Sequence, residues 1–423
     1  MSASFEPDPD IRAILDRLPA LDGNEAAAPM LPAECYTSAA FFEFERTRVF
    51  TRSWICVGRV EQIPAAGDFL APQIGDEPLL VVRREDGSIG AMSAVCQHRG
   101  QIVATEAGTT GRTFRCPLHF WSYDLEGRVA GAPRLDSRED LECVRRTVRL
   151  PPVRLEIWHG FVFVNLDPEA APLAPSLAKI EPFWQGYEDA DLVAIPPTPA
   201  DKSLPWNWKI HAENFTDAYH PEFVHCGTHD FAPSIHADGG VEFTPMKAGD
   251  NAIVRTVPLL RPDGGMMEDG WGAAAAFPAI ETLSPAQRSH VTFALIPPGM
   301  TLIFAPGNVA YQLITPVGVT ETYASNDRVT AGGWLVPRAT FERADFAERT
   351  AAVREGGRKI WLQDIPVNLG VQAGKHSRFA PDGAHYTALE TTLVQFNAWL
   401  LRSYLAARDA AASEEHSPRR AGA

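Results

Sequence analysis

The sequence predicts an α+β protein, made of an all-β module and a larger domain in which helices accompany an antiparallel sheet. Between residues 50 and 168, short apolar runs alternate with turn residues, which is typical of an all-β module. A Pro- and Ala-rich segment at residues 168–175 then indicates a linker. Beyond it, runs of helical period occur together with four consecutive strand-like runs, which predict an antiparallel sheet.

The N-terminal part, residues 1–49, is expected to be a tail followed by a helix that packs on the larger domain. Residues 1–33 are acidic and rich in Ala and Pro, and they predict a short helix near residues 11–17. A second helix is predicted from residue 39 to residue 50, because apolar residues recur on one face. Ser38 is a suitable N-cap for it.

The predicted all-β module contains several short strands and one strongly apolar strand. The short strands are expected at residues 69–70, 79–83, 89–92 and 113–115, with a hairpin turn at residues 85–88. The apolar run 158–165 predicts a single buried strand.

In the larger domain, residues 206–209 are expected to begin a helix. Residues 228–290 are rich in Gly, Ala and Pro, and a stretch so long and weakly patterned is usually functional, so we expect it to line a substrate pocket. Strands are predicted at residues 291–296, 300–304, 310–317 and 323–335. Helices are predicted at residues 340–364, where Pro366 is an expected stop, and at residues 388–408. The polar residues 411–423 predict a disordered tail.

Composition and charge exclude several classes of protein. The chain has 423 residues, enough for two or three domains, and its 45% hydrophobic and 22% charged residues are ordinary for a globular protein. A net charge of −15 argues against binding to nucleic acid or to an anionic membrane. The six cysteines show no disulfide framework, and neither a signal peptide nor an apolar run long enough to span a membrane is visible. The cytoplasm is therefore the expected location.

Two mixed pairs of Cys and His form the first candidate metal site. Cys96 and His98 are separated by one residue, and Cys116 and His119 by two. Two thiolates and two imidazoles can bind zinc, or they can hold a Rieske [2Fe–2S] cluster with two Cys on one iron and two His on the other. A zinc finger places both Cys in one pair and both His in the other. The mixed pairs therefore favour the cluster over zinc, or over four residues unrelated to a metal.

The second candidate site lies at residues 214–225, where His220 and His225 accompany Asp217 and Glu222. Two histidines and one carboxylate are the ligands of non-haem Fe(II) centres that leave positions open for dioxygen. The alternative is a pair of surface or cap histidines on a helix. Residues five apart diverge by about 140° on a straight helix, so joint ligation requires a bulge or a break, for which Pro221 is well placed.

Residues 96–100 and 116–127 resemble the Rieske motif of the Rieske non-haem iron oxygenases, and residues 214–225 resemble the mononuclear-iron motif of their large (alpha) subunit, of the aromatic-ring-hydroxylating dioxygenase type. The resemblance extends over roughly residues 36–405. It implies a Rieske [2Fe–2S] domain at residues 50–168 and a helix-grip-like catalytic domain at residues 169–410. The implied cofactors are the Rieske cluster and a mononuclear Fe(II), with O2 as co-substrate.

The resemblance also implies roles for single residues of the cluster. Cys96 and Cys116 would bind one iron of the cluster, and His98 and His119 the other. The family usually has Gly after the second His, where this chain has Phe120, and the bulky side chain could alter how a partner approaches the cluster.

At the mononuclear site, the resemblance makes His220 and His225 the histidine ligands. Asp364, in an acidic motif that precedes Gln372, is the candidate third ligand, although Gln363 replaces the usual acidic residue before it. Asp217 is the catalytic residue that would bridge His220 to a cluster histidine of a neighbouring subunit. We expect it to share a helix face with His220, since three residues separate them. An ordinary helix carboxylate is the alternative for both acids, and the role of Asn214 stays open.

The implied function is that of the terminal oxygenase component of a multicomponent system, which hydroxylates a small, aromatic substrate, by dihydroxylation or monooxygenation, as in aromatic hydrocarbon catabolism. The sequence shows no dinucleotide-binding motif, so electrons from NAD(P)H must arrive through a ferredoxin, a reductase, or both. A homotrimer is expected, with an additional beta subunit as a possibility. One alternative is an N- or O-demethylating monooxygenase, including one acting on quaternary ammonium compounds. The other is a Rieske electron carrier without catalysis.

Overall fold

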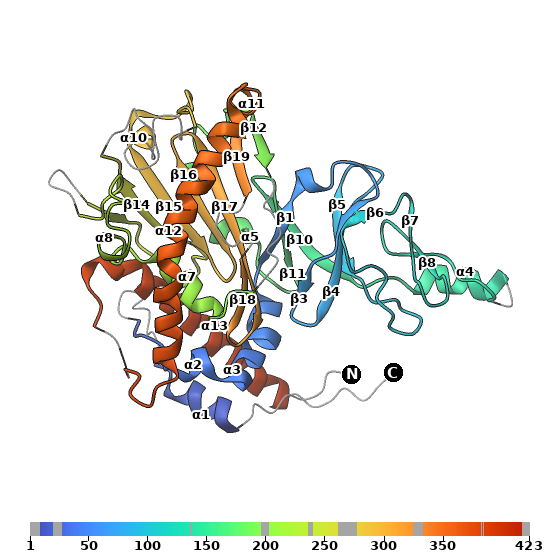
Figure 1. Ribbon diagram of the computed structural model, residues 1–423. Coiled ribbons are helices and arrows are strands. Elements are labelled where there is room, and N and C mark those ends of the chain that lie inside the picture. Colours follow the sequence, from blue (N-terminus) through green and yellow to red (C-terminus); the bar gives the residue numbers. More distant parts are fainter. Residues whose placement is uncertain are drawn as a thin grey trace. The chain divides into compact units, whose positions relative to one another are not determined.

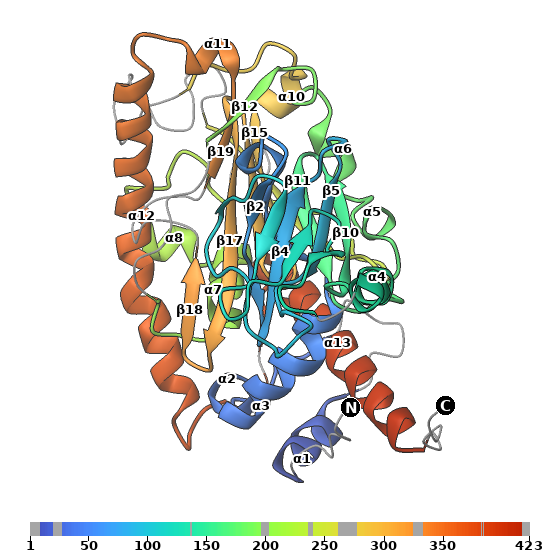
Figure 2. The same ribbon diagram turned by 90° about the vertical axis from the view of Figure 1, so that its right-hand side faces the viewer.

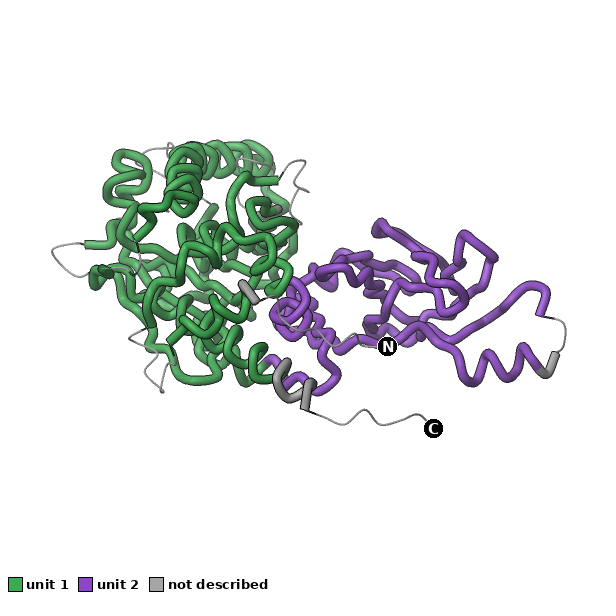
Figure 3. Tube along the Cα trace, turned by 90° about the horizontal axis from the view of Figure 1, so that it is seen from below, with its two compact units in different colours: residues 1–45, 174–423 green, residues 46–173 purple. Residues whose placement is uncertain are grey.

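The computed structural model describes residues 9–19, 28–135, 138–195, 203–235, 240–260, 277–324, 333–381, 383 and 385–416. The chain divides into two compact units (Figure 3). One unit comprises residues 46–173, and the other comprises residues 1–45 together with residues 174–423. The Gly- and Ala-rich runs at residues 264–265 and 273–276, and the last part of the expected tail, lie outside the described residues.

The unit of residues 46–173 is built mainly from antiparallel strands (Figure 1). An eight-stranded sheet has the order β1-β11-β10-β5-β4-β2-β6, with β3 paired to β4, and β7, β8 and β9 form a separate three-stranded sheet. The strands are β1 Ile55–Arg59, β2 Asp68–Leu70, β3 Gln73–Ile74, β4 Glu77–Arg83, β5 Ile89–Ser93, β6 Gly108–Thr109, β7 Thr113–Arg115, β8 Ser122–Asp124, β9 Val129–Gly131, β10 Pro152–Trp158 and β11 Phe161–Asn165. Helix α4, Arg138–Thr147, and the short 3-10 turns η3 Phe50–Arg52 and η4 Val60–Gln62 complete the unit.

The expected single strand at residues 158–165 is wrong, because a turn divides this run into β10 and β11. Trp158 pairs with Phe161 in the antiparallel register, so the turn consists of His159 and Gly160. Both have positive φ, 45° and 77°, which is the backbone geometry of the two-residue hairpin loops that match strand twist. A Gly in second place supports this turn, whereas the apolar residues on both sides conceal it in the sequence.

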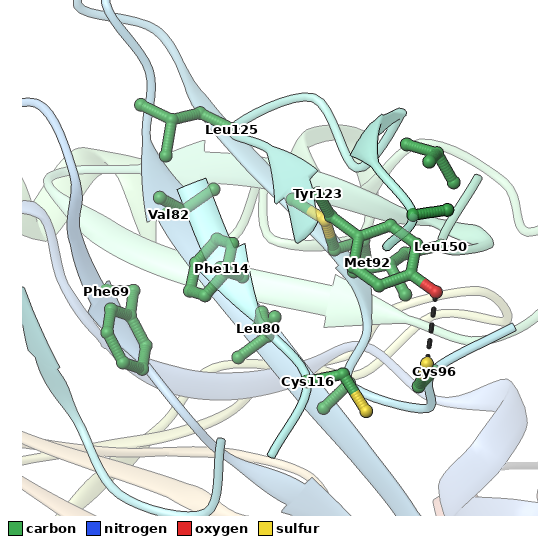
Figure 4. Close-up of a cluster of buried hydrophobic side chains, with 13 residues drawn as sticks. Phe69, Leu80, Val82, Met92, Cys96, Phe114, Cys116, Tyr123, Leu125 and Leu150 are labelled. Atoms are coloured by element: carbon green, nitrogen blue, oxygen red, sulfur yellow. Dashed lines mark hydrogen bonds between the residues drawn. The ribbon is translucent and has the colours of Figure 1, made fainter. Parts of the chain in front are cut away.

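A hydrophobic cluster fills the unit beneath the two cysteines of the first candidate site (Figure 4). Phe69 and Phe114 meet edge to face, with ring centroids 5.0 Å apart. Cys96 and Cys116 belong to this buried cluster, together with Tyr123. Because close-packed interiors hold side chains in fixed positions, the packing of this cluster fixes the positions of both thiols.

The other unit is organised around a second eight-stranded antiparallel sheet, of order β12-β19-β17-β16-β15-β14-β13, with β18 paired to β17. Its strands are β12 Leu192–Ile195, β13 Glu242–Phe243, β14 Ile253–Pro258, β15 His290–Ile296, β16 Met300–Ala305, β17 Asn308–Gly318, β18 Glu321–Ala324 and β19 Gly333–Pro337. The expected strand at residues 323–335 is therefore two strands, β18 and β19. The predicted α+β class, with an all-β module and a larger domain that contains an antiparallel sheet, is confirmed.

Helices cover this sheet, and the long helix α12 runs along one face (Figure 1, Figure 2). Helix α7 contacts strands β14, β15 and β17 as well as α12 and α13. The helices are α1 Pro9–Arg17, α2 Glu34–Thr37, α3 Ala39–Phe44, α5 Leu173–Ser176, α6 Glu181–Trp184, α7 Trp208–Thr216, α8 Pro221–Val224, α10 Pro285–Arg288, α11 Arg338–Phe341, α12 Phe346–Lys375 and α13 Thr391–His416, with the 3-10 turn η5 Ala388–Glu390. None of the described helices is long and apolar enough to cross a membrane.

Two helix ends differ from the expectation. Pro366 lies inside α12 and does not stop it. Asp364, Asn368 and Gln372 are buried at four-residue intervals on either side of the proline, and these tertiary contacts outweigh the roughly 3 kcal/mol that an interior proline costs. Helix α13 continues to His416, so residues 411–416 of the expected tail are helical. Alanine, abundant in this stretch, is the strongest helix former.

A buried ion pair joins the N-terminal helices to α7 within the larger unit. Ser38 caps α3 as predicted, since its side chain accepts a hydrogen bond from the Phe41 N–H. After α3 the chain continues as a π-helical turn, Glu45–Val49. The Glu45 carboxylate and the Lys209 ammonium are fully buried and lie 2.8 Å apart. Glu45 also accepts hydrogen bonds from the Trp208 indole and the Tyr404 hydroxyl, so α3, α7 and α13 meet at one carboxylate.

Candidate metal centres

A break between two helices brings His220 and His225 together. Helix α7 begins after Asn207, whose side chain caps the Lys209 N–H, and it ends at Asp217, where the backbone becomes extended. Helix α8 then begins with Pro221, between the two histidines. The imidazole rings of His220 and His225 lie 5.1 Å apart, so the predicted break is present and both side chains face one point.

Helix α12 supplies a carboxylate to the same point. Oδ1 of Asp364 lies 3.1 Å from Nε2 of His225 and 3.6 Å from Nε2 of His220. Three ligands that bind one ion from about 2.1 Å at right angles stand about 3 Å from one another. The His–His–carboxylate set therefore fits a divalent metal of the ferrous type.

Neighbouring side chains hold two of these three candidate ligands, His225 and Asp364. Gln363 Oε1 lies 3.0 Å from Nδ1 of His225, and Asn214 donates to Oδ1 of Asp364 over 3.1 Å. Such contacts fix ring orientation and tautomer at metal sites. From the sequence, Gln363 was a departure from an acidic motif and the role of Asn214 was undecided. In the structure, both side chains contact the candidate ligands and hold them in place.

Asp217 contacts His220, but the two do not share a helix face as expected. The segment between them is a turn in which Asp217 accepts hydrogen bonds from the backbone N–H groups of Tyr219 and His220. Its Oδ2 also lies 2.9 Å from Nδ1 of His220. Burial raises the pKa of Asp217, but these hydrogen bonds and the charge of His220 outweigh burial and hold that pKa below its usual value.

A cavity of about 250 Å³ opens beside the three candidate ligands. As expected, its wall includes His229, Phe231 and Arg255 from the weakly patterned region and side chains from the strands that follow. Side chains of α7 and the face of α12 from Val353 to Asp364 also line it, and the sequence did not predict these. Burial lowers the pKa of His229 to about 3, helped by the charge of Arg255, so its imidazole is neutral near pH 7.

The first candidate site consists of two loops of the same form. The Gly100 N–H donates to the Cys96 carbonyl over 2.9 Å, and the Phe120 N–H donates to the Cys116 carbonyl over 3.0 Å. Gly100 and Phe120 end their loops with φ of 78° and 59°. Phe120 thus adopts the left-handed conformation that favours glycine, the residue expected at this place.

Thiols and imidazoles lie on different sides of these loops. Cys96 and Cys116 are buried, whereas His98 and His119 are exposed, with their rings 4.7 Å apart. Trp121 stacks on His98 at 4.8 Å. The Tyr123 hydroxyl lies 3.1 Å from the Cys96 thiol (Figure 4). Burial is the main cause that raises the pKa of Tyr123, and the contact with Cys96 raises that pKa further. Two buried sulfur ligands and two exposed nitrogen ligands fit a Rieske cluster whose histidine iron faces solvent.

Comparison with protein families gives the same two parts. Residues 53–150 match the Rieske [2Fe–2S] domain, and residues 184–406 match the ring-hydroxylating alpha subunit catalytic domain. The chain belongs to the ring-hydroxylating alpha-subunit family. The resemblance drawn from the sequence is confirmed, and the two domains imply a Rieske cluster, a mononuclear iron and the use of O2.

Relatives within this family include both monooxygenases and dioxygenases. The carnitine monooxygenase oxygenase subunit of Escherichia coli K12 is 32% identical over 219 residues, which are 51% of this chain and 56% of that protein. The biphenyl 2,3-dioxygenase subunit alpha of Rhodococcus jostii RHA1 is 32% identical over 194 residues, covering 45% and 42%. The chain thus spans about half the length of the curated relatives that it matches.

Solved structures show the same fold over nearly the whole chain. Naphthalene 1,2-dioxygenase from Rhodococcus sp. superposes with a TM-score of 0.72 at 19% identity, covering 94% of this chain and 99% of that one. The quaternary ammonium Rieske monooxygenase CntA gives a TM-score of 0.71 at 21% identity, covering 90% and 97%.

Proposed function

We propose that this protein is the terminal oxygenase component of a multicomponent Rieske oxygenase and hydroxylates a small, aromatic substrate. The convergence of His220, His225 and Asp364 at the wall of one cavity carries this proposal. When bound, a ferrous ion at this triad supplies dioxygen activation and the cluster supplies electrons. The protein residues orient the ligands and place the substrate.

The cluster ligands in this proposal are Cys96, Cys116, His98 and His119. The two imidazoles are exposed at the loop tips, where a redox partner can approach them. The partner is a ferredoxin, an NAD(P)H-dependent reductase, or both, and the cytoplasm is the proposed location. The acidic net charge of −15 would favour a partner with a basic face.

Asp217 is the proposed connection between subunits. It already holds His220 through Oδ2, and its side chain is partly exposed. A carboxylate in this place can accept a further hydrogen bond from a cluster histidine of a second subunit. A homotrimer closed by head-to-tail contacts would supply that histidine in each subunit, with or without a beta subunit.

A demethylating monooxygenase is the second candidate function. It is favoured by the similarity to subunits of carnitine and glycine betaine monooxygenases, which match 51% and 46% of the chain. The two functions share the candidate metal sites and differ in the product, since demethylation releases formaldehyde whereas ring hydroxylation retains every carbon.

Iron counting and isotope labelling test the proposal together. The reconstituted protein should hold about three irons and two acid-labile sulfides per chain, because a Rieske cluster accounts for two irons. With a reductase and ¹⁸O2, one or both labelled atoms should enter the product. A protein with two irons per chain and no labelled product from a panel of aromatic and quaternary ammonium compounds would be an electron carrier instead.

A further inference from the structure

One row of directly paired residues crosses the sheet under the cavity. Arg255 on β14 pairs with Phe293 on β15, and Phe293 pairs with Ile303 on β16. Ile303 in turn pairs with Ala310 on β17, and Ala310 with Trp334 on β19. All five residues line the cavity. Because directly paired residues point to the same side of a sheet, the cavity floor is apolar along this row and ends in a cation on β14.

The Arg255 guanidinium is buried, with 4% of the residue exposed, and its Cζ lies 4.1 Å from the centre of the Phe293 ring. It donates one long hydrogen bond, 3.5 Å, to the Phe215 carbonyl, and its Nε has no hydrogen-bond partner in the described part of the chain. Burial lowers the pKa of Arg255 to about 10, while the charge of Asp217 acts in the opposite direction. The group is therefore still a cation at neutral pH.

No acidic side chain among the described residues forms an ion pair with Arg255. Asp217, near the cavity, is engaged by His220. Asp364 is the acidic residue of the described cavity wall, and it is engaged by His225 and Asn214. A buried charge without a partner is costly, and proteins retain one where a ligand supplies the counter-charge. The planar guanidinium group of arginine carries paired N–H donors whose geometry matches the two oxygens of a carboxylate.

We propose that the substrate carries a carboxylate and that Arg255 binds it at the β14 end of the cavity. This inference rests on the proposed oxygenase function and names the substrate class of the same site. The remainder of the substrate then lies over Phe293 and Ile303. The His229 ring lies 6.1 Å from the His225 ring and 6.4 Å from the Phe293 ring, so the candidate metal ligands and the Arg255 end are within reach of one small molecule.

The size of the cavity limits that molecule to about one ring. An apolar protein cavity of about 150 Å³ holds a benzene molecule. The 250 Å³ found here therefore accommodates a single ring with a carboxylate, or a short aliphatic chain of similar volume. A quaternary ammonium compound without a carboxylate would instead place a second cation near Arg255, which like-charge repulsion disfavours.

Paired probes that differ in charge alone test the inference by binding. Affinities of the iron-loaded, oxidised protein are measured by anaerobic calorimetry for benzoate and for benzamide, its neutral counterpart of the same shape. γ-Butyrobetaine and butyltrimethylammonium, in which a methyl group replaces the carboxylate, form a second pair, which shows whether the remainder of the substrate is a ring or an ammonium group. At least one carboxylate should bind tenfold or more tightly than its partner. Equal affinities within both pairs, or no binding of either carboxylate, would overturn the inference.

Three variants assign the effect to Arg255. Arg255→Gln should weaken carboxylate binding by about thirtyfold or more, the loss expected when one member of a buried charge pair is removed, and should leave benzamide binding unchanged. Arg255→Lys should restore part of the loss, because it keeps the charge without the fork geometry. Arg358→Gln, on the exposed surface of α12, is the matched control and should bind as the parent protein does.

Folding and function are checked independently of this result. Iron content and thermal denaturation show whether Arg255→Gln is folded, and if it is not, the comparison of probes on the parent protein and on Arg255→Lys decides. If neutral substrates incorporate ¹⁸O while carboxylates neither bind nor react, the carboxylate inference fails and the oxygenase function stands. If no compound gives labelled product although benzoate binds tightly, the carboxylate inference stands and the oxygenase function fails.

Discussion

Oδ1 of Asp364 lies 3.1 Å from Nε2 of His225, although one residue is in the middle of α12 and the other follows α8. The contact closes the triad, and it depends on how α12 crosses the sheet. Asp364→Ala should therefore lose the mononuclear iron and turnover while keeping the cluster. The iron content should fall from about three to about two per chain, and the Rieske EPR signal should be unchanged. Glu355→Ala on the exposed side of α12 is the control. Full activity with three irons in Asp364→Ala would exclude this ligand.

Asp217 holds His220 without completing the triad, so its replacement should separate metal binding from electron transfer. Asp217→Asn should retain both metals and a cluster that the reductase still reduces. Single-turnover product formation should slow by about 10- to 100-fold, the usual effect of altering a residue that supports a metal ligand. Glu222→Gln, in the same segment, should react at the parent rate. Unimpaired single-turnover kinetics in Asp217→Asn, or a fully active monomer, would contradict the proposed electron transfer between subunits through Asp217.

Local spacing was enough to predict much of the candidate site. The Cys96–His98 pair and the His220–His225 pair are visible in the sequence because their members are near neighbours, and Pro221 indicated the break that the structure shows. Arg255 carried no such signal. Its role depends on the register of five strands, which places it in one row with Phe293, and on the absence of an ion-pair partner in the described structure. Neither property is encoded within a short window of sequence.

The same distinction applies to the fold. Strand and helix types were predicted well where apolar period and turn residues agreed. The errors arose where tertiary contacts outweigh local preference, as at Pro366 inside α12, or where a turn is hidden in an apolar run, as at His159. The boundaries at residues 50 and 168 stay a prediction.

The buried pair of Lys209 and Glu45 should control stability. Lys209→Met leaves the Glu45 carboxylate buried with hydrogen bonds from Trp208 and Tyr404 but without a counter-charge, which should cost about 3–5 kcal/mol of unfolding free energy. Adding Glu45→Gln should restore more than half of that loss. Urea unfolding followed by tryptophan fluorescence measures both variants. A double variant no more stable than Lys209→Met would show that charge is not the cause.

Phe120 offers a test of backbone strain beside the cluster. Its φ of 59° costs a non-glycine residue about 1 kcal/mol or more. Phe120→Gly relieves this cost, whereas Phe120→Ala keeps it and removes the ring. The Gly variant should therefore be more stable than the Ala variant by about 1 kcal/mol, measured from the loss of cluster absorption on heating. A control introduces the same strain where the chain now has glycine. Gly87 lies in an exposed hairpin turn with φ of 83°, so Gly87→Ala should destabilise the domain by a similar amount.

His229 should make stability depend on pH. Burial holds the pKa of its imidazole near 3, well below the usual value of 6.5, so the unfolded chain binds this proton more readily than the folded chain does. Stability then falls as the pH drops below about 6.5, and at pH 5.5 His229 alone should cost up to about 1.4 kcal/mol relative to neutral pH. In His229→Asn, the difference in unfolding free energy between pH 7.5 and pH 5.5 should shrink by that amount. His385→Asn, at an exposed position, should leave it unchanged. Urea unfolding at the two pH values decides the matter, and an identical pH dependence in the His229→Asn and parent proteins would show that this imidazole is not held neutral by burial.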